Sequence, residues 1–239
     1  MKNKLLILLL VLCAHLAAET LHLSIRYLGM PVVRVTMTDQ DSTLLVTAKA
    51  TTVATIAAKM NNRYEVHYRG SYLGESYKKR IKQKDYQEDR EIRYMRDAGT
   101  AKRTSRISPS RNRIYPIQSD CRDFFSALYF LRTAKQDAGS LCLDAVGMMW
   151  DVTYKVVKHE TIQTALGKVP ARKMKMNFSK REDRDTERSD MLTNNLVSDR
   201  TLYFWFSDDD RNIPVKAVFK MSPFSVVWRL DSYEKTSDL

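Results

Sequence analysis

The residues that could carry acid–base or metal chemistry are few and scattered along this chain. His22, His67 and His159 are the histidines beyond the N-terminal segment, and none has a metal-ligand spacing such as H-x-x-x-H. The chain contains no Gly-x-Ser-x-Gly elbow and no glycine-rich phosphate loop. Because an active site needs titratable groups that converge, we expect no catalytic residues, no metal site and no cofactor.

Three consecutive aspartates, Asp208 to Asp210, are the clearest candidates for a cation site, because Ca²⁺ prefers closely spaced carboxylate oxygens. The stretch lacks the further spaced oxygen ligands of a calcium loop. We therefore favour a tight turn between two strands, in which Asp209 or Asp210 pairs with Arg211 or with Arg132.

A run of basic residues without an intervening acid occupies positions 101–113, AKRTSRISPSRNR. Its serines and Pro109 predict a loop for the second half. A basic arm can contact an anionic surface, although a solvated connector has the same composition. The candidate anion-contacting residues are Lys102, Arg103, Arg106, Arg111 and Arg113.

Methionine and aromatic side chains adapt to flexible apolar partners, so they are candidates for lining a hydrophobic site. The same side chains also suit a packed core, and both interpretations stay open. The candidate ligand-binding residues are Phe124, Leu128, Tyr129, Met149, Trp150, Met174, Met176, Tyr203, Trp205 and Trp228, with Met148 beside them.

The first residues have the layout of a secretory signal peptide. Lys2 and Lys4 precede an apolar run at 5–12, and small residues follow at Ala17 and Ala18. We expect a signal peptide at 1–18, export to the periplasm and one domain at 19–239. An uncleaved N-terminal segment that anchors the chain is the alternative, and no later stretch is apolar enough to span a membrane.

Without residues 1–18 the chain keeps a net charge of about +10. In an exported protein this charge favours anionic lipid headgroups or an anionic envelope polymer as partners, and we expect no nucleic acid. Solubility alone is the other explanation.

Cys121 and Cys142 are the cysteines that remain, and in an oxidising compartment they predict a disulfide. The closed loop would stabilise the fold by about 3 kcal/mol in the chain-entropy model.

Alternation of apolar and polar residues predicts short antiparallel strands over most of the chain. LHLSIRYL and VVRVTMT form a first hairpin around Gly29 and Pro31, and RTLYFWFS, IPVKAVFKM and FSVVWRLDSYE close the chain as three strands. Residues 64–106 read as exposed strands whose alternating charges mark a solvated face. We expect a short helix at 53–60 and a mobile polar loop at 179–196.

One stretch, DCRDFFSALYFLR at 120–132, is convincingly helical. Asp120 can cap its N-terminus, with Asp123 in the first turn. Phe124, Leu128 and Leu131 then share one face at helical spacing. The pattern predicts an all-β protein, mainly antiparallel, in which an open or spiralling barrel-like sheet wraps around one central helix.

Three segments resemble the bacterial exported family called domain of unknown function 3108. They are IRYLGMPVVRVTMT, DCRDFFSALYFLR and WFSDDDRNIPVKAVFKMSPFSVVWRL, which together span nearly all of the chain after the signal peptide. Met30 replaces the usual isoleucine, and Arg122 to Phe124 stand where a proline commonly opens the helix. The resemblance implies an exported β-rich barrel-like domain with a packed helix, and no established activity.

These observations favour a non-enzymatic periplasmic protein that binds a lipid or another hydrophobic or anionic envelope component. Contact with the membrane surface is compatible with this prediction. Two alternatives remain open. One is a scaffold that binds an envelope protein through an exposed sheet edge or the basic arm, and the other is an envelope hydrolase whose site the sequence does not reveal.

Overall fold

The computed structural model describes residues 18–55, 59–134, 136–183, 185–194, 201–220 and 225–236. The expected signal peptide lies outside these ranges except for Ala18. The strands are β1 (Glu19–Tyr27), β2 (Met30–Gln40), β3 (Thr43–Ala50), β4 (Asn61–Arg69), β5 (Leu73–Gln83), β6 (Tyr86–Met95), β7 (Thr100–Ser105), β8 (Arg113–Pro116), β9 (Ala138–Ala145), β10 (Met148–Thr164), β11 (Gly167–Lys180), β12 (Leu202–Ser207), β13 (Pro214–Phe219) and β14 (Val226–Lys235). The helices are α1 (Thr52–Thr55), α2 (Phe124–Thr133) and α3 (Met191–Asn194), with short 3₁₀ turns at Arg96–Ala98 and Pro109–Arg111.

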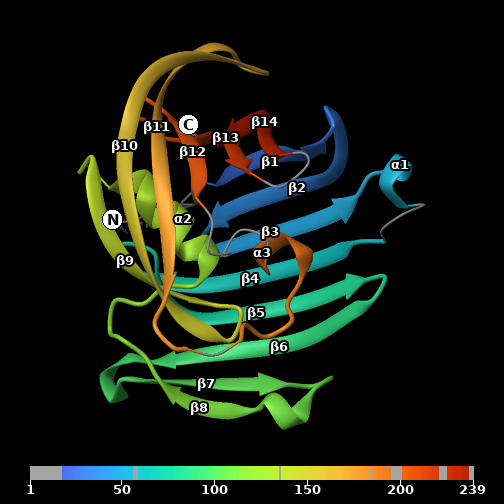
Figure 1. Ribbon diagram of the computed structural model, residues 1–239, viewed down its shortest axis with the longest axis vertical. Helices are drawn as coiled ribbons and strands as arrows, with labels where there is room; N and C mark the ends of the chain where they lie inside the picture. Colours follow the sequence, from blue (N-terminus) through green and yellow to red (C-terminus); the bar gives the residue numbers. More distant parts are fainter. Residues whose placement is uncertain are drawn as a thin grey trace, which may run out of the picture.

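All of these strands belong to one antiparallel sheet. Neighbours in sequence pair from β1 to β8 and from β9 to β14, and β14 then pairs with β1. The sheet is open, with β8 and β9 as its edges, and it curls around α2 (Figure 1). This confirms the predicted fold class, an antiparallel open barrel-like sheet with one central helix.

Side chains connect the two edge strands where they approach each other. The hydroxyl of Tyr115 in β8 donates to Asp144 Oδ2 in β9 at 2.6 Å. Arg113 Nη2 donates to the carbonyl of Gly147, just after β9, at 2.5 Å. The sheet remains open, since β8 and β9 share no backbone ladder. Polar side chains connect these two edges instead.

Helix α2 begins later than the sequence indicates. Asp123 is the N-cap, and its Oδ1 accepts the backbone N–H groups of Phe125 and Ser126 at 3.0 Å each. The prediction that Asp120 caps the helix is wrong, because Asp120 lies in a separate turn and Arg122 after it bridges to Leu143 of β9. A buried Asp cap of this kind is typically worth about 1 kcal/mol.

Two arginines fix the end of α2. Arg172 of β11 donates to the carbonyls of Leu131 and Ala134, which have no partner further along the helix. Arg132 points away from its own helix end and pairs with Glu19 of β1 at 2.6 Å. Strand β11 therefore supplies the donors for the terminal carbonyls of α2.

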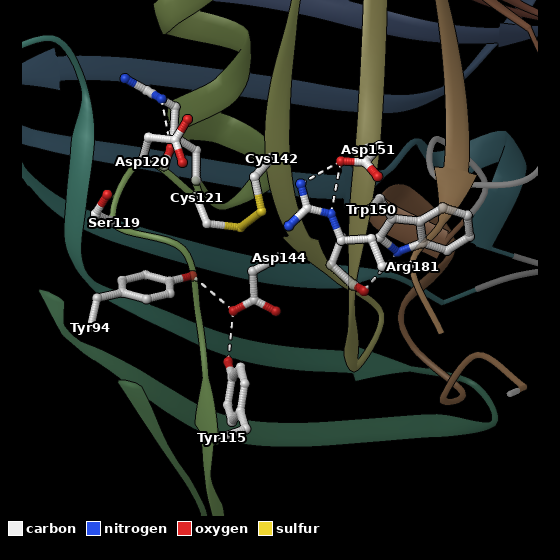
Figure 2. The surroundings of a disulfide bond; sticks show 12 residues. Tyr94, Tyr115, Ser119, Asp120, Cys121, Cys142, Asp144, Trp150, Asp151 and Arg181 are labelled. Carbon is white, nitrogen blue, oxygen red and sulfur yellow. Dashed lines mark hydrogen bonds and ion pairs between the residues drawn. A yellow bond between two sulfur atoms is a disulfide. The ribbon is translucent and has the colours of Figure 1, made fainter. Parts of the chain in front are cut away.

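The predicted disulfide between Cys121 and Cys142 is present, with the two Cα atoms 4.4 Å apart. It joins the segment that enters α2 to β9, as Figure 2 shows. The predicted turn at Asp208–Asp210 is also confirmed, since Arg211 Nε donates to Asp209 Oδ2 at 2.9 Å.

The segment 185–194, which we call the strap, does not form the mobile loop that its composition predicted. Asp190, Leu192 and Thr193 are buried inside the curve of the sheet. Figure 1 shows α3, the last turn of the strap, over the middle of the sheet near β4, and Asp190 before it contacts Tyr64 of β4 and Lys79 of β5.

The helix expected at 53–60 is shorter, since α1 covers Thr52–Thr55 and residues 56–58 lie outside the described ranges.

Candidate functional site

Most of the candidate ligand-binding residues belong to the packed interior. A hollow of about 10 Å³ between α2 and the sheet is lined by Phe124, Leu128, Met176 and Phe204 among others, and this volume suits about one water molecule. A lipid chain does not fit there, because α2 fills the space. The remaining interior candidates, each less than one tenth exposed, are Tyr129, Met148, Trp150, Met174 and Trp228.

Three candidates lie on the other face of the sheet. Side chains alternate between faces along a strand, and Phe204 of β12 points inward to α2. Tyr203 and Trp205 therefore point outward. Met149 follows the buried Met148 in β10, so its side chain also points to the outer face. The candidate ligand-binding residues therefore do not line one common cavity.

The basic arm is also divided between two faces. Arg103 is 2% exposed and lies on the inner face of β7, and Arg113 of β8 is half-buried beside it. Lys102 and Arg106 are exposed, and Arg106 lines an outer groove of about 310 Å³ and pairs with Asp89 at 3.5 Å. Arg111 is partly exposed and lies in the 3₁₀ turn after β7. The five residues do not form a single arm.

The inner face of β5 to β8 and the strap enclose a polar space that we call the interior chamber. Lys79 Nζ lies 2.8 Å from Asp190 Oδ2, and both side chains are buried. Arg103 pairs with Glu187 of the strap and with Glu88 of β6. The strap thus supplies carboxylates to cations that the strands bury.

The charges of the interior chamber match one another. Arg113 pairs with Glu187 at 3.2 Å and Arg90 with Glu88 at 3.3 Å. Burial alone would raise the pKa of Asp190, but the ammonium of Lys79 outweighs it and lowers that pKa below its ordinary value. The chamber is therefore held by internal ion pairs at neutral pH.

Asp144 belongs to the same chamber. Tyr94 and Tyr115 both donate their hydroxyls to Asp144 Oδ2, at 3.2 and 2.6 Å, beside the disulfide (Figure 2). Burial raises the pKa of Asp144, and the hydrogen bond from Tyr115 and the charge of Arg90 oppose this effect without cancelling it.

The outer face of the opposite half of the sheet has a different charge pattern. Residues directly opposite on neighbouring strands share a face, so the register defines rows that cross the sheet. One row, which we call row one, crosses eight strands from β10 to β3. Its members are Lys158, Lys173, Trp205, Lys216, Arg229, Ser24, Arg34 and Lys49.

A second row, row two, runs beside it on the same face, two residues along each strand. It combines cations with apolar and aromatic side chains. Its members are Lys155, Lys175, Tyr203, Val218, Val227 and Arg26. We call rows one and two together the basic outer face.

Like charges stand directly opposite each other in the basic outer face. Lys216 faces Arg229, and Arg34 faces Lys49. Burial lowers the pKa of Lys216, and the charge of Arg229 lowers it further. Directly opposed like charges destabilise a sheet, so the intramolecular contacts alone do not explain this arrangement.

Few acids compensate these cations. Lys158 pairs with Glu160 at 2.7 Å, and Arg26 Nε donates to Ser24. Among the residues that the structure describes, the other cations of the two rows form no salt bridge. Aromatic faces offset part of the charge instead, since Lys173 and Lys216 both lie over the ring of Trp205 at 4.9 and 4.6 Å.

The sequence alone did not reveal the interior chamber or the basic outer face. Strand periodicity correctly indicated β5 and β6, but it assigned their charges to a solvated face, whereas Lys79 and Arg90 point inward. The rows depend on pairing between strands far apart in the chain, such as β1 with β14. The alternation of Lys173 and Lys175 with methionines was the local signal for the basic outer face.

No metal centre or membrane-crossing helix emerges from the described ranges. Within them, no cluster of three or more His, Cys, Asp or Glu side chains could hold a metal ion. None of the helices in those same ranges is long and apolar enough to cross a membrane.

The family relationship follows from residues 22–226, which match the family described as protein of unknown function (DUF3108). The match covers most of the chain, so this protein belongs to that family. None of the curated proteins matches the chain.

The fold is similar to that of a crystal structure titled as a beta-barrel-like protein of domain of unknown function DUF1849 from Brucella abortus. The TM-score is 0.55 and the identity 9%, over 93% of this chain and 98% of that chain. A candidate lipoprotein from Parabacteroides distasonis has a TM-score of 0.35 and an identity of 11%, over 91% and 95% of the two chains. The first likeness concerns the fold alone, and the second is too weak to support an argument.

Proposed function

We propose that this protein is an exported, non-enzymatic component of the bacterial cell envelope that binds an anionic membrane surface through its basic outer face. The observation that carries the proposal is the unbalanced charge of rows one and two, in which cations oppose cations across neighbouring strands. An anionic partner would relieve this repulsion. The N-terminal signal pattern and the disulfide support export.

The composition of the face favours lipid headgroups over a small soluble anion. Each Lys or Arg near an anionic lipid surface contributes about 1 kcal/mol of attraction. Tyr203 lies among these cations with part of its side chain exposed, and Val218 and Val227 add apolar area. Aromatic residues with one apolar and one polar end suit the boundary between lipid and water. A spread of cations over many strands suits a surface better than a pocket.

The interior gives a further reason to place the lipid outside. Helix α2 leaves only a small hollow against the sheet, and the titratable groups of the interior chamber pair with one another. Lipid contact through headgroups requires neither an internal cavity nor a free acid or base.

Co-sedimentation with vesicles tests the proposal. Phosphatidylethanolamine vesicles with phosphatidylglycerol should bind the protein, and vesicles without it should not. A variant with Arg34→Gln, Lys49→Gln and Arg229→Gln should bind about a hundredfold more weakly, because it loses three contributions of about 1 kcal/mol each. These side chains are exposed, so the fold should persist.

A matched variant with Arg80→Gln, Lys82→Gln and Lys102→Gln removes the same charge from exposed positions of β5 and β7. It should retain most of the affinity. Equal losses in both variants would show that net charge and not the basic outer face governs binding. Equal binding to vesicles with and without phosphatidylglycerol would overturn the proposal.

A further inference from the structure

The turn between β1 and β2 exposes three large apolar side chains together. Tyr27, Leu28 and Met30 are 37%, 54% and 53% exposed. A Cβ placed on Gly29 would meet nothing within 4 Å, so the tip of the turn projects into open space. At 54% and 53% exposure, the side chains of Leu28 and Met30 gain little from packing within the protein.

The backbone of this turn is also unfavourable for its sequence. Leu28 has φ of 52° and Gly29 has φ of 79°. Two consecutive positive φ values define a turn that usually selects Asn-Gly or Asp-Gly, because a branched side chain in the left-handed region crowds the backbone. The other non-glycine residues with positive φ in the described ranges are polar or at least partly buried: Asp41, Ser42, Tyr72, Val146 and Asn212.

Leu28 therefore combines a strained backbone with an exposed apolar side chain. Asn at this position would relieve both costs, so the fold itself gives no reason for leucine. A strained residue that the fold does not require is an indication of function.

The position of the turn shows what could cover it. Tyr27 pairs with Val226 and Met30 at the ends of their strands. Arg26, the preceding residue, belongs to row two and faces Val227. By the alternation of side chains along β1, Tyr27 and its partner Met30 lie on the face opposite Arg26, so the apolar tip stands at the strand ends beside row two and not on the basic outer face itself.

Two acids lie beyond row one, two residues along the strands from Lys158 and Arg229. Glu160 pairs with Lys158, and Asp231 accepts from the Ser24 hydroxyl at 3.0 Å; we call these two positions the acidic border. From Asp231 through row one and row two to Leu28, the surface changes from acidic to basic to apolar. A membrane with anionic headgroups above an apolar layer matches the basic and apolar parts of this order.

We propose that the β1–β2 turn inserts Leu28 and its neighbours Tyr27 and Met30 below the headgroups of the anionic membrane that the basic outer face binds. This inference rests on the proposed function and adds the orientation of the protein. The turn enters the lipid, rows one and two contact the headgroups, and the acidic border faces away.

The variant Leu28→Asn tests the inserted side chain. Asn suits the left-handed turn, so the thermal stability should be unchanged or higher. Binding to vesicles with phosphatidylglycerol should weaken roughly tenfold, because one apolar side chain no longer transfers from water. The control Leu166→Asn alters an apolar residue that is 38% exposed at the β10–β11 turn, beyond the acidic border, and should leave binding unchanged.

Brominated phosphatidylglycerol gives a direct measure of depth. Trp150, Trp205 and Trp228 are at most 5% exposed, so their fluorescence gives a low background of quenching. A variant with Leu28→Trp should be quenched on brominated vesicles, and one with Leu166→Trp should not.

The outcomes separate the two proposals. If Leu28→Asn binds as tightly as the unaltered protein and Leu28→Trp is not quenched, the insertion is overturned while binding through the basic outer face stands. If the unaltered protein does not distinguish anionic vesicles, the proposed function fails first.

Discussion

The interior chamber and the basic outer face both contain cations on neighbouring strands. Carboxylates compensate these cations in the chamber, but few acids do so on the outer face. In the chamber each cation has a carboxylate partner, as in the pair of Lys79 with Asp190. On the outer face, Lys216 and Arg229 oppose each other without a salt bridge in the described part of the chain. Burial explains the contrast, because a charge removed from water needs a partner and an exposed charge does not.

This difference separates a structural role from a binding role. The chamber already holds its counter-ions, two of which, Glu187 and Asp190, come from the strap. The outer face still lacks them. We therefore expect substitutions in the chamber to change the free energy of unfolding, and substitutions in the rows to change binding.

The largest effect should follow Lys79→Met, which leaves Asp190 buried without its cation. We expect the free energy of unfolding to fall by about 3 to 5 kcal/mol. Urea denaturation measures this loss, and vesicle binding of the folded fraction should be unchanged. The double variant Lys79→Met with Asp190→Asn should recover part of the stability, because it removes the unpaired charge and keeps an oxygen that can accept from Tyr64, Leu192 and Thr193. A loss below about 1 kcal/mol would show that the ion pair of Lys79 with Asp190 contributes little to the stability of the fold.

The pH dependence of Asp190 should give a smaller effect with a defined sign. Its pKa is lower in the folded protein than its unfolded value of about 3.9. Its contribution to stability is thus complete above that value and is lost as the pH falls through the folded pKa. The stability difference between the unaltered protein and Asp190→Asn should stay constant down to about pH 5 and narrow below about pH 4. A difference that closes near pH 6 would contradict this assignment.

The smallest effect should follow Lys49→Gln on the outer face. Lys49 stands opposite Arg34, so its removal should raise the free energy of unfolding by about 0.2 to 0.5 kcal/mol at low salt. Added salt should abolish the gain. The control Lys78→Gln removes a cation that faces Glu65 and Glu91 and should lower stability slightly. Equal effects at the two positions would remove the distinction between the faces.

Local sequence patterns predicted the strands well because alternation depends only on neighbouring residues. The hairpin around Gly29 and the strands at β12 to β14 lie where expected. The start of α2 was misplaced because Asp120 and Asp123 are equally good caps in sequence. Only the bridge from the preceding segment to β9 decides between them.

The candidate site was harder to predict because it depends on register. The alternation in β5 places Lys79 on the same face as Tyr77 and Ile81, but the local sequence shows no partner for a buried lysine. The buried side chain is Lys79 because Asp190 of the strap lies opposite it. Likewise, a polar segment such as 185–194 resembles a mobile loop until its carboxylates meet buried cations. The contact of Lys79 with Asp190 joins residues 111 positions apart.

The pairing of β1 with β14 also sets the order in which the molecule can fold. Strand β1 gains one partner as soon as β2 forms, but its other edge waits for β14, whose residue Trp228 lies opposite Ile25. Such distant pairing slows folding, because a long loop must close before its contacts form. A chain that crosses a membrane during export would therefore leave one edge of β1 unpaired until β14 has followed it.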